Sequence, residues 1–293
     1  MDIGIVNKIK RLAIVALASD DDLIETIVLK GGNAIDIAYH HSTQSVSRTS
    51  FDLDFSIEDG DFKDDLESVK QRIHKTLVQT FSENGYVVID YNFIHKPKTV
   101  KEPVADFWGG YLVTFKVVEQ QVFEKANNFD LQRRLAVPLK PDRSTKFELE
   151  FSKFEYVADK TAIDVDGYTI YVYTPEMIVF EKVRAICQQL PQYAEVIKSH
   201  TPRARARDFY DIYLIMESCG VVVDAKDNIQ LLQHIFDAKR VPVEFIQEIR
   251  NNKTIHFQNW DSVKDTVSQT EALREFDFYF NYVVEKFESI TFP

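Results

Sequence analysis

The sequence predicts an α+β protein with a β-rich N-terminal part and a helical C-terminal part. Short β-branched or alternating runs, bounded by turn residues, occur between residues 25 and 173. Thr174 and Pro175 then form a helix-start signal, and mostly helical patterns follow them. With 293 residues, the chain exceeds the usual size of one hydrophobic core. We therefore predict two domains, residues 1–173 and residues 174–293.

The composition is that of an ordinary globular protein, with 45% hydrophobic and 28% charged residues. The formal net charge of −11 argues against a protein that coats nucleic acid, so any nucleic-acid partner has to meet a local basic patch. Cys187 and Cys219 lack the spacing of a disulfide framework or a metal site, which indicates a reducing, cytoplasmic location. No stretch has the length and apolar character of a bilayer span, so we expect no membrane partner.

Local patterns predict each element in turn. Residues 5–16 have the apolar spacing of an amphipathic helix, which we prefer to a signal peptide because the apolar run 12–18 is short. Residues 62–83 repeat apolar side chains every three or four positions and predict a long helix. Strands are predicted at residues 25–29, 51–55, 86–93, 111–118, 145–151 and 169–173, and further helices at residues 33–41, 175–190, 207–218, 227–237, 242–251 and 269–289.

Two short segments carry the residues that suggest chemistry. Asp52 and Asp54 alternate with apolar residues, so a strand would present both carboxylates on one face, about 7 Å apart. Two magnesium ions held by such a pair could position a triphosphate and activate a hydroxyl group. Gly31 and Gly32 would let the backbone approach phosphate oxygens at the start of the next helix.

Each segment alone has a simpler interpretation. An Asp-x-Asp strand is usually a solvated face, and a Gly-Gly pair is usually a turn. Together, in the order strand, Gly-Gly, helix, loop and Asp-x-Asp strand, the two segments indicate a functional site far more specifically than either does alone. Two adjacent acids on a strand also repel each other, and a bound cation would compensate that cost.

These segments resemble the AbiEii/AbiGii family of nucleotidyltransferase toxins, within the polymerase-beta-like superfamily. The resemblance extends over about residues 25–218 and implies an N-terminal mixed sheet with flanking helices, followed by a helical domain. It also implies transfer from a nucleoside triphosphate (NTP) with two Mg²⁺ ions, or Mn²⁺ in their place. The matching segments are Leu29-Lys30-Gly31-Gly32-Asn33-Ala34, Arg48-x-Ser50-x-Asp52-Leu53-Asp54-Phe55, Glu181-Lys182-Val183-Arg184-Ala185 and Arg207-Asp208-Phe209-Tyr210-Asp211-Ile212.

The resemblance extends the candidate site beyond Asp52 and Asp54. It implies a third catalytic carboxylate on a neighbouring strand, and the pattern Glu150-Phe151-Ser152 favours Glu150, with Glu148 as the alternative. Asn33 stands where the family more often has threonine or serine, so its amide would replace a hydroxyl as the phosphate donor.

The two later segments lie on helices. Lys182 matches a lysine that contacts phosphate in the family, although it would otherwise be a solvent residue. It lies off the packed stripe, so we expect its loss to cost no more than about 0.5 kcal/mol of stability. Asp208 is a further catalytic candidate. Together with Asp211, it could instead cap its helix and pair with the arginines before it.

The arginines before Asp208 form a dense basic segment in an acidic chain. Arg203 and Arg205 are the candidates for RNA binding, and Arg207, Lys198 and Arg184 extend the patch. The resemblance implies a toxin that transfers a nucleotide to an RNA acceptor such as the 3′ end of transfer RNA (tRNA), with a cognate antitoxin encoded nearby. A small-molecule or protein acceptor stays open, and so does a nucleotide-binding regulator without transfer activity.

Overall fold

The computed structural model describes residues 2–39, 51–99, 104–140, 142–198, 200–264 and 273–292. The chain divides into two compact units. Of the described residues, the first unit holds 2–33 and 51–172, and the second holds 34–39 and 173–292. Arg48 and Ser50 of the Asp-x-Asp segment lie outside the described residues.

The described part of the first unit contains one seven-stranded mixed sheet in the order β3-β4-β5-β2-β1-β7-β6. β1 pairs with β7 and β2 pairs with β5 in parallel, whereas the other neighbours are antiparallel. The predicted α+β class with a mixed sheet is confirmed. The strands are β1 (Ile27–Lys30), β2 (Leu53–Ile57), β3 (Tyr86–His95), β4 (Gly110–Glu119), β5 (Phe147–Ser152), β6 (Thr161–Val165) and β7 (Tyr168–Val172).

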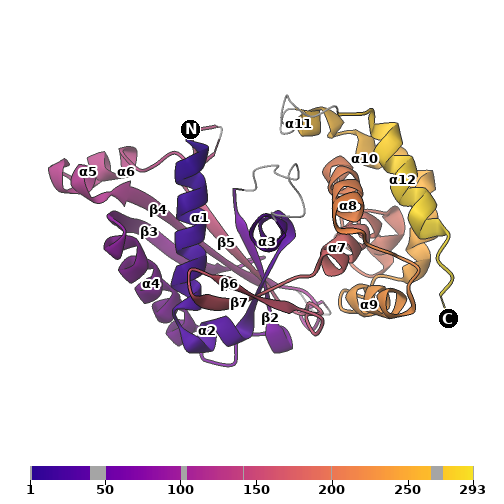
Figure 1. Ribbon diagram of the computed structural model, residues 1–293, viewed down its shortest axis with the longest axis horizontal. Coiled ribbons are helices and arrows are strands. Elements are labelled where there is room, and N and C mark those ends of the chain that lie inside the picture. Colours follow the sequence, from indigo (N-terminus) through magenta and orange to yellow (C-terminus); the bar gives the residue numbers. More distant parts are fainter. Residues whose placement is uncertain are drawn as a thin grey trace. The chain divides into compact units, whose positions relative to one another are not determined.

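Helices cover the apolar face of this sheet, where α1 (Ile3–Ala18) packs beside α4 (Leu66–Glu83) (Figure 1). β5 shows why only one face is apolar, because its buried Phe147, Leu149 and Phe151 alternate with Glu148 and Glu150. The short α5 (Gln120–Lys125) and α6 (Phe129–Arg134) pack near β4, between the strands predicted at residues 111–118 and 145–151.

Capping residues set helix boundaries that periodicity alone predicts poorly. α4 starts at Leu66 rather than at residue 62 because the Asp65 carboxylate accepts hydrogen bonds from the first turn. Asp20 caps α2 (Asp21–Thr26) in the same way, through the Leu23 amide. That helix takes up the first two residues of the predicted strand 25–29, so β1 begins at Ile27.

The second unit is helical in its described part. Thr174 caps α7 (Pro175–Cys187), as predicted, with its hydroxyl accepting from the Met177 amide at 3.3 Å. The core lies between α8 and α12, where the Phe209 ring contacts Phe276 and Phe280. The other helices are α3 (Gly31–Ala38, begun in the first unit), α8 (Ala206–Cys219), α9 (Lys226–Asp237), α10 (Lys253–Phe257), α11 (Trp260–Lys264) and α12 (Phe276–Glu288), with 3₁₀ turns at Pro191–Glu195, Val243–Glu248 and Arg250–Asn252.

Three further predictions of elements were wrong in detail. Strand β6 was missed, although Asp166 and Gly167 form the turn that joins it to β7, both with positive φ. The helix predicted at 242–251 consists of 3₁₀ turns. The last helix starts at Phe276 rather than at residue 269, and residues 269–272 lie outside the described residues. None of the described helices is long and apolar enough to cross a membrane.

Candidate active site

The carboxylates predicted to carry chemistry lie on the polar face of two neighbouring parallel strands. In β2 and β5, Asp54 is the register partner of Glu150, and Leu53 is the partner of Leu149. Adjacent strands lie about 4.8 Å apart, so Asp54 and Glu150 are direct neighbours. Asp52 differs from the prediction, because β2 begins at Leu53 and Asp52 lies just before it. The parallel register therefore selects Glu150, rather than Glu148, as the neighbour of Asp54.

Glu148 has a different environment from Glu150. Its carboxylate contacts Lys146 at 2.8 Å and Lys140 at 3.1 Å, whereas Glu150 contacts Lys96. Burial alone would raise the pKa of Glu148, but the two lysines outweigh burial and hold that pKa below its ordinary value. Glu148 is thus ionised at neutral pH and neutralised by lysines.

Lys140 also contacts the Oδ1 atom of Asp52, at 2.9 Å. Burial lowers the pKa of its ammonium group, but the hydrogen bonds and charges of Asp52 and Glu148 outweigh burial and raise the pKa above its ordinary value. Neither Lys140 nor Lys96 was among the predicted site residues. Nothing local marks them as site residues, because Asp52 and Glu150, which they contact in the site, lie far from them in the sequence.

Gly31 brings the start of α3 against the carboxylate of Asp54. Its φ of 70° lies in the left-handed region that glycine adopts without strain. A Cβ atom at this position would lie 3.3 Å from Oδ2 of Asp54, closer than most real Cβ contacts. Gly32 follows with helical backbone. The Gly-Gly pair therefore lies beside the Asp-x-Asp segment, and the turn interpretation also holds, since Gly31 supplies the turn.

Asn33 is buried and uses its side chain to hold the site together. Its Oδ1 accepts a hydrogen bond from Lys10 Nζ at 2.9 Å, and its Nδ2 donates to the backbone carbonyl of Asp52 at 2.6 Å. The amide predicted to donate to phosphate thus fastens α3 to the chain at Asp52. Lys10 was missed as a participant, although it falls on the buried stripe of α1, where a lysine needs a polar partner.

In the second unit, Lys182 bridges two carboxylates of α8. Its Nζ lies 3.0 Å from Asp208 and 2.7 Å from Asp211, and the three side chains are only 16%, 10% and 13% exposed. The expectation that Lys182 points away from packed structure was wrong, because α7 and α8 pack against each other and enclose it. The N-cap residue of α8, Arg205, makes no side-chain capping hydrogen bond, and its guanidinium pairs with Asp208 at 3.3 Å.

Only some of the residues predicted for the basic patch before α8 lie at the surface. Arg203 and Lys198 are exposed, and Arg205 is 41% exposed while it contacts Asp208. Arg184 is buried and contacts Glu181 at 3.4 Å, so it does not belong to a surface patch. Its position on the packed side of α7 is the reason.

The oxygen donors of the first unit suit a magnesium ion by type. Asp52, Asp54 and Glu150 supply hard carboxylate ligands, and magnesium is usually held by one or two carboxylates plus substrate phosphates. Within the described ranges, no group of three or more His, Cys, Asp or Glu side chains is gathered tightly enough to hold an ion alone. The residues therefore fit an ion that arrives with a triphosphate rather than a closed protein cage.

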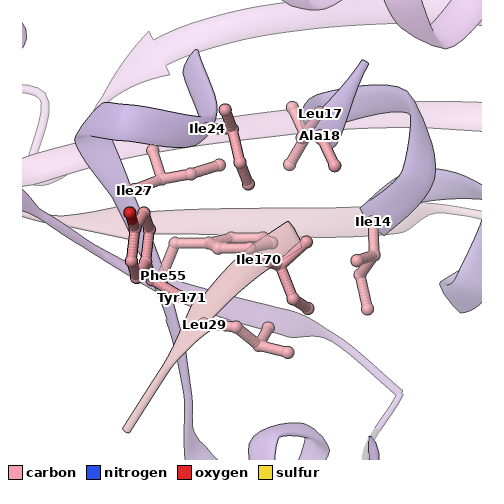
Figure 2. A pocket seen from close by; sticks show the side chains of 9 residues that line it. All are labelled: Ile14, Leu17, Ala18, Ile24, Ile27, Leu29, Phe55, Ile170 and Tyr171. Carbon is pink, nitrogen blue, oxygen red and sulfur yellow. The ribbon is translucent and has the colours of Figure 1, made fainter. Parts of the chain in front are cut away.

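A small pocket in the first unit is not a substrate site. Figure 2 shows mostly aliphatic and aromatic side chains around it, and its volume of about 10 Å³ holds at most one water molecule. It is lined by Ile14, Leu17, Ala18, Ile24, Ile27, Leu29, Phe55, Ile170 and Tyr171.

Solved structures of other proteins are similar to this chain. A solved Helicobacter pylori protein assigned as a nucleotidyltransferase shares 16% identity with a TM-score of 0.48, covering 96% of this chain and 92% of that chain. JHP933 from Helicobacter pylori shares 15% identity with a TM-score of 0.48, covering 96% and 89%. An antigenic nucleotidyltransferase-like protein from Paracoccidioides brasiliensis shares 16% identity with a TM-score of 0.36, covering 84% and 94%.

No curated protein matches the sequence. The family model described as "Nucleotidyl transferase AbiEii toxin, Type IV TA system" matches residues 13–282, which is most of the chain. This chain therefore belongs to the AbiEii family of nucleotidyltransferase toxins of type IV toxin–antitoxin systems.

Proposed function

We propose that this protein transfers a nucleotide from an NTP to an RNA acceptor, such as the 3′ end of tRNA, with two Mg²⁺ ions, or Mn²⁺ in their place. The observation that carries the proposal is the register of β2 and β5, which puts Glu150 beside Asp54, next to the start of α3. Three features needed for nucleotide transfer thus meet in one unit: carboxylates for metal ions, an acid–base group, and backbone amides for phosphate.

Each residue has a separate task in this proposal. Asp52 and Asp54 hold the metal ions, and the amides of Gly31 and Gly32 hold phosphate oxygens. Asn33 positions Asp52 through its hydrogen bond to the Asp52 carbonyl. When bound, the ions supply positive charge that offsets the triphosphate and the developing charge on the reacting oxygens.

The chemical step is a substitution at the α-phosphorus. The acceptor hydroxyl oxygen forms a bond to this phosphorus, the bond to the bridging oxygen breaks, and pyrophosphate leaves with the bond electrons. Glu150 accepts the hydroxyl proton as general base. The Glu150 carboxylate forms an ion pair with Lys96.

The second unit contributes the nucleotide contact Lys182 and the catalytic candidate Asp208. In the structure, Asp208 and Asp211 hold the Lys182 ammonium, so Asp208 acts by orienting a phosphate-binding cation. Arg203 and Arg205 contact the RNA backbone, because an acidic chain needs a local patch for a polyanion. We take residues 1–173 as the catalytic domain and 174–293 as the helical domain, with a cognate antitoxin as protein partner in the cytoplasm.

The test is incubation of the purified protein with each labelled NTP, total RNA and Mg²⁺ or Mn²⁺. We expect label in RNA with the wild type, and none with Asp54→Asn or Glu150→Gln. The matched control is Glu83→Gln, an exposed acid at the end of α4, which should transfer normally. Thermal melting shows whether each variant is folded.

Each result separates one alternative. Label in protein or in a small molecule, with RNA unlabelled, would reject the RNA acceptor and keep the transferase. Absence of transfer by the folded wild type to every acceptor offered would reject transferase activity and favour a nucleotide-binding regulator. Full transfer by Asp54→Asn would remove that residue from the metal site.

A further inference from the structure

Lys140 forms an ion pair with Asp52, whose carboxylate is a metal ligand in the proposed function. Its Nζ lies 2.9 Å from Asp52 Oδ1 and 3.1 Å from Glu148 Oε2, and the side chain is 23% exposed. The ammonium group donates a hydrogen bond to Glu148 and forms an ion pair with Asp52, so it lies between an acid of the proposed site and an acid outside it.

The backbone at Lys140 is held firmly. The amides of Leu139 and Lys140 both donate to the Ser144 carbonyl, at 2.8 and 3.2 Å, and the Arg143 amide donates to the Lys140 carbonyl at 2.9 Å. Leu139 is fully buried beside this turn. A fixed backbone limits the reach of the ammonium group to the two carboxylates it now touches.

A divalent ion and an ammonium group compete for the same oxygen of Asp52. A magnesium-sized ion binds carboxylate oxygen at about 2.1 Å, so a cation already on Oδ1 must move when the ion arrives. Glu148 offers the ammonium group another acceptor within reach. This arrangement gives a reason for the second glutamate on β5, which is not the neighbour of Asp54.

We propose that Lys140 is a positioning residue that holds Asp52 in the metal-free protein and moves onto Glu148 when the metal ion binds. Lys140 thereby neutralises the repelling acids before substrate arrives and sets the metal affinity of the site. This inference rests on the proposed function, because it takes Asp52 as a metal ligand. It adds a competitor cation and assigns Glu148 the task of receiving it.

Binding of Mn²⁺ alone provides the test, with free Mn²⁺ measured by electron paramagnetic resonance at constant pH and ionic strength. Lys140→Met should tighten Mn²⁺ binding about tenfold, because a repelling charge near the ion is lost. Lys140→Arg should stay within about twofold of wild type, since it keeps the cation. The matched control Lys146→Met, which removes an exposed cation that contacts Glu148, should change the affinity less than Lys140→Met.

Glu148→Gln tests the exchange without altering Lys140. It removes the second acceptor, so Mn²⁺ binding should weaken about threefold. In the Lys140→Met background the same change should have almost no effect, because Glu148 acts through Lys140. If Lys140→Met does not fold, Lys140→Gln replaces it and the Glu148→Gln result still bears on the inference.

The outcomes distinguish the inference from the proposed function. Unchanged or weaker Mn²⁺ binding in folded Lys140→Met, with Asp52→Asn abolishing binding, would overturn the role of Lys140 and leave the metal site intact. Unchanged Mn²⁺ affinity in Asp52→Asn would overturn the metal site itself, and the role of Lys140 with it.

Discussion

Replacing Lys182 with methionine removes a cation that two largely enclosed carboxylates share. Asp208 and Asp211 are 10% and 13% exposed and lie 3.0 and 2.7 Å from the Lys182 ammonium. Removing one partner of a buried ion pair typically costs about 3–5 kcal/mol, because the remaining charge stays buried. Arg205 still contacts Asp208 after the change, so we place the cost near the lower limit, at about 3 kcal/mol. This replaces the value of about 0.5 kcal/mol expected for an exposed lysine.

Urea unfolding at pH 7, followed by circular dichroism, measures this cost. Lys198→Met is the matched control, because Lys198 is exposed, and its cost should stay within about 0.5 kcal/mol. Adding Asp211→Asn to Lys182→Met should recover about 1 kcal/mol or more, since one buried charge is then removed. The same proteins, under conditions where all are folded, are titrated with ATP in a calorimeter.

Two results would refute this reasoning. A cost below about 1 kcal/mol for Lys182→Met would mean that the bridge contributes little to stability. An additive double variant would mean that Lys182 and Asp211 do not interact. The calorimetric titration tests nucleotide binding separately: equal ATP affinity in wild type and folded Lys182→Met would assign Lys182 a structural role alone.

Three further predictions concern other parts of the chain. Burial lowers the pKa of His256 to about 4, below its ordinary 6.5; Asp208 opposes this shift and Arg205 adds to it, each with a smaller effect. The unfolded state therefore binds more protons between those two pKa values. The unfolding free energy should therefore fall by about 2 kcal/mol more in the wild type than in His256→Phe between pH 7 and pH 5, as measured by urea unfolding; an equal fall would disprove it. Gly31→Ala should lower the unfolding free energy by about 1 kcal/mol and weaken Mn²⁺ binding. Gly85 also has a positive φ, but a Cβ there would meet nothing within 4 Å, so Gly85→Ala should lower the unfolding free energy as much without affecting Mn²⁺ binding. An equal loss of Mn²⁺ affinity in both variants would contradict the contact with Asp54. Changing Arg203 and Arg205 together to glutamine should reduce the slope of log RNA affinity against log salt by about one unit per lost phosphate contact, and an unchanged slope would exclude this patch.

Several local features of the fold were predictable because they depend on neighbours within a few residues. Thr174 and Pro175 mark the start of α7, and the apolar stripe of α4 predicts that helix. The alternation in β5 correctly separates its buried residues from Glu148 and Glu150. Local competition explains one of the errors, since Asp20 caps a helix that displaces the start of β1.

The sequence by itself determined the residue types of the site: the Gly-Gly pair, the acids before and within β2, and two glutamates on β5. Only the tertiary structure decided their pairing. The parallel register chose Glu150 as the neighbour of Asp54, and packing brought Lys140 to Asp52, Lys10 to Asn33 and Lys182 to the acids of α8. The physical reason is distance along the chain. Periodicity and caps are set by adjacent residues, whereas strand register and buried ion pairs join segments that meet only when the core has formed.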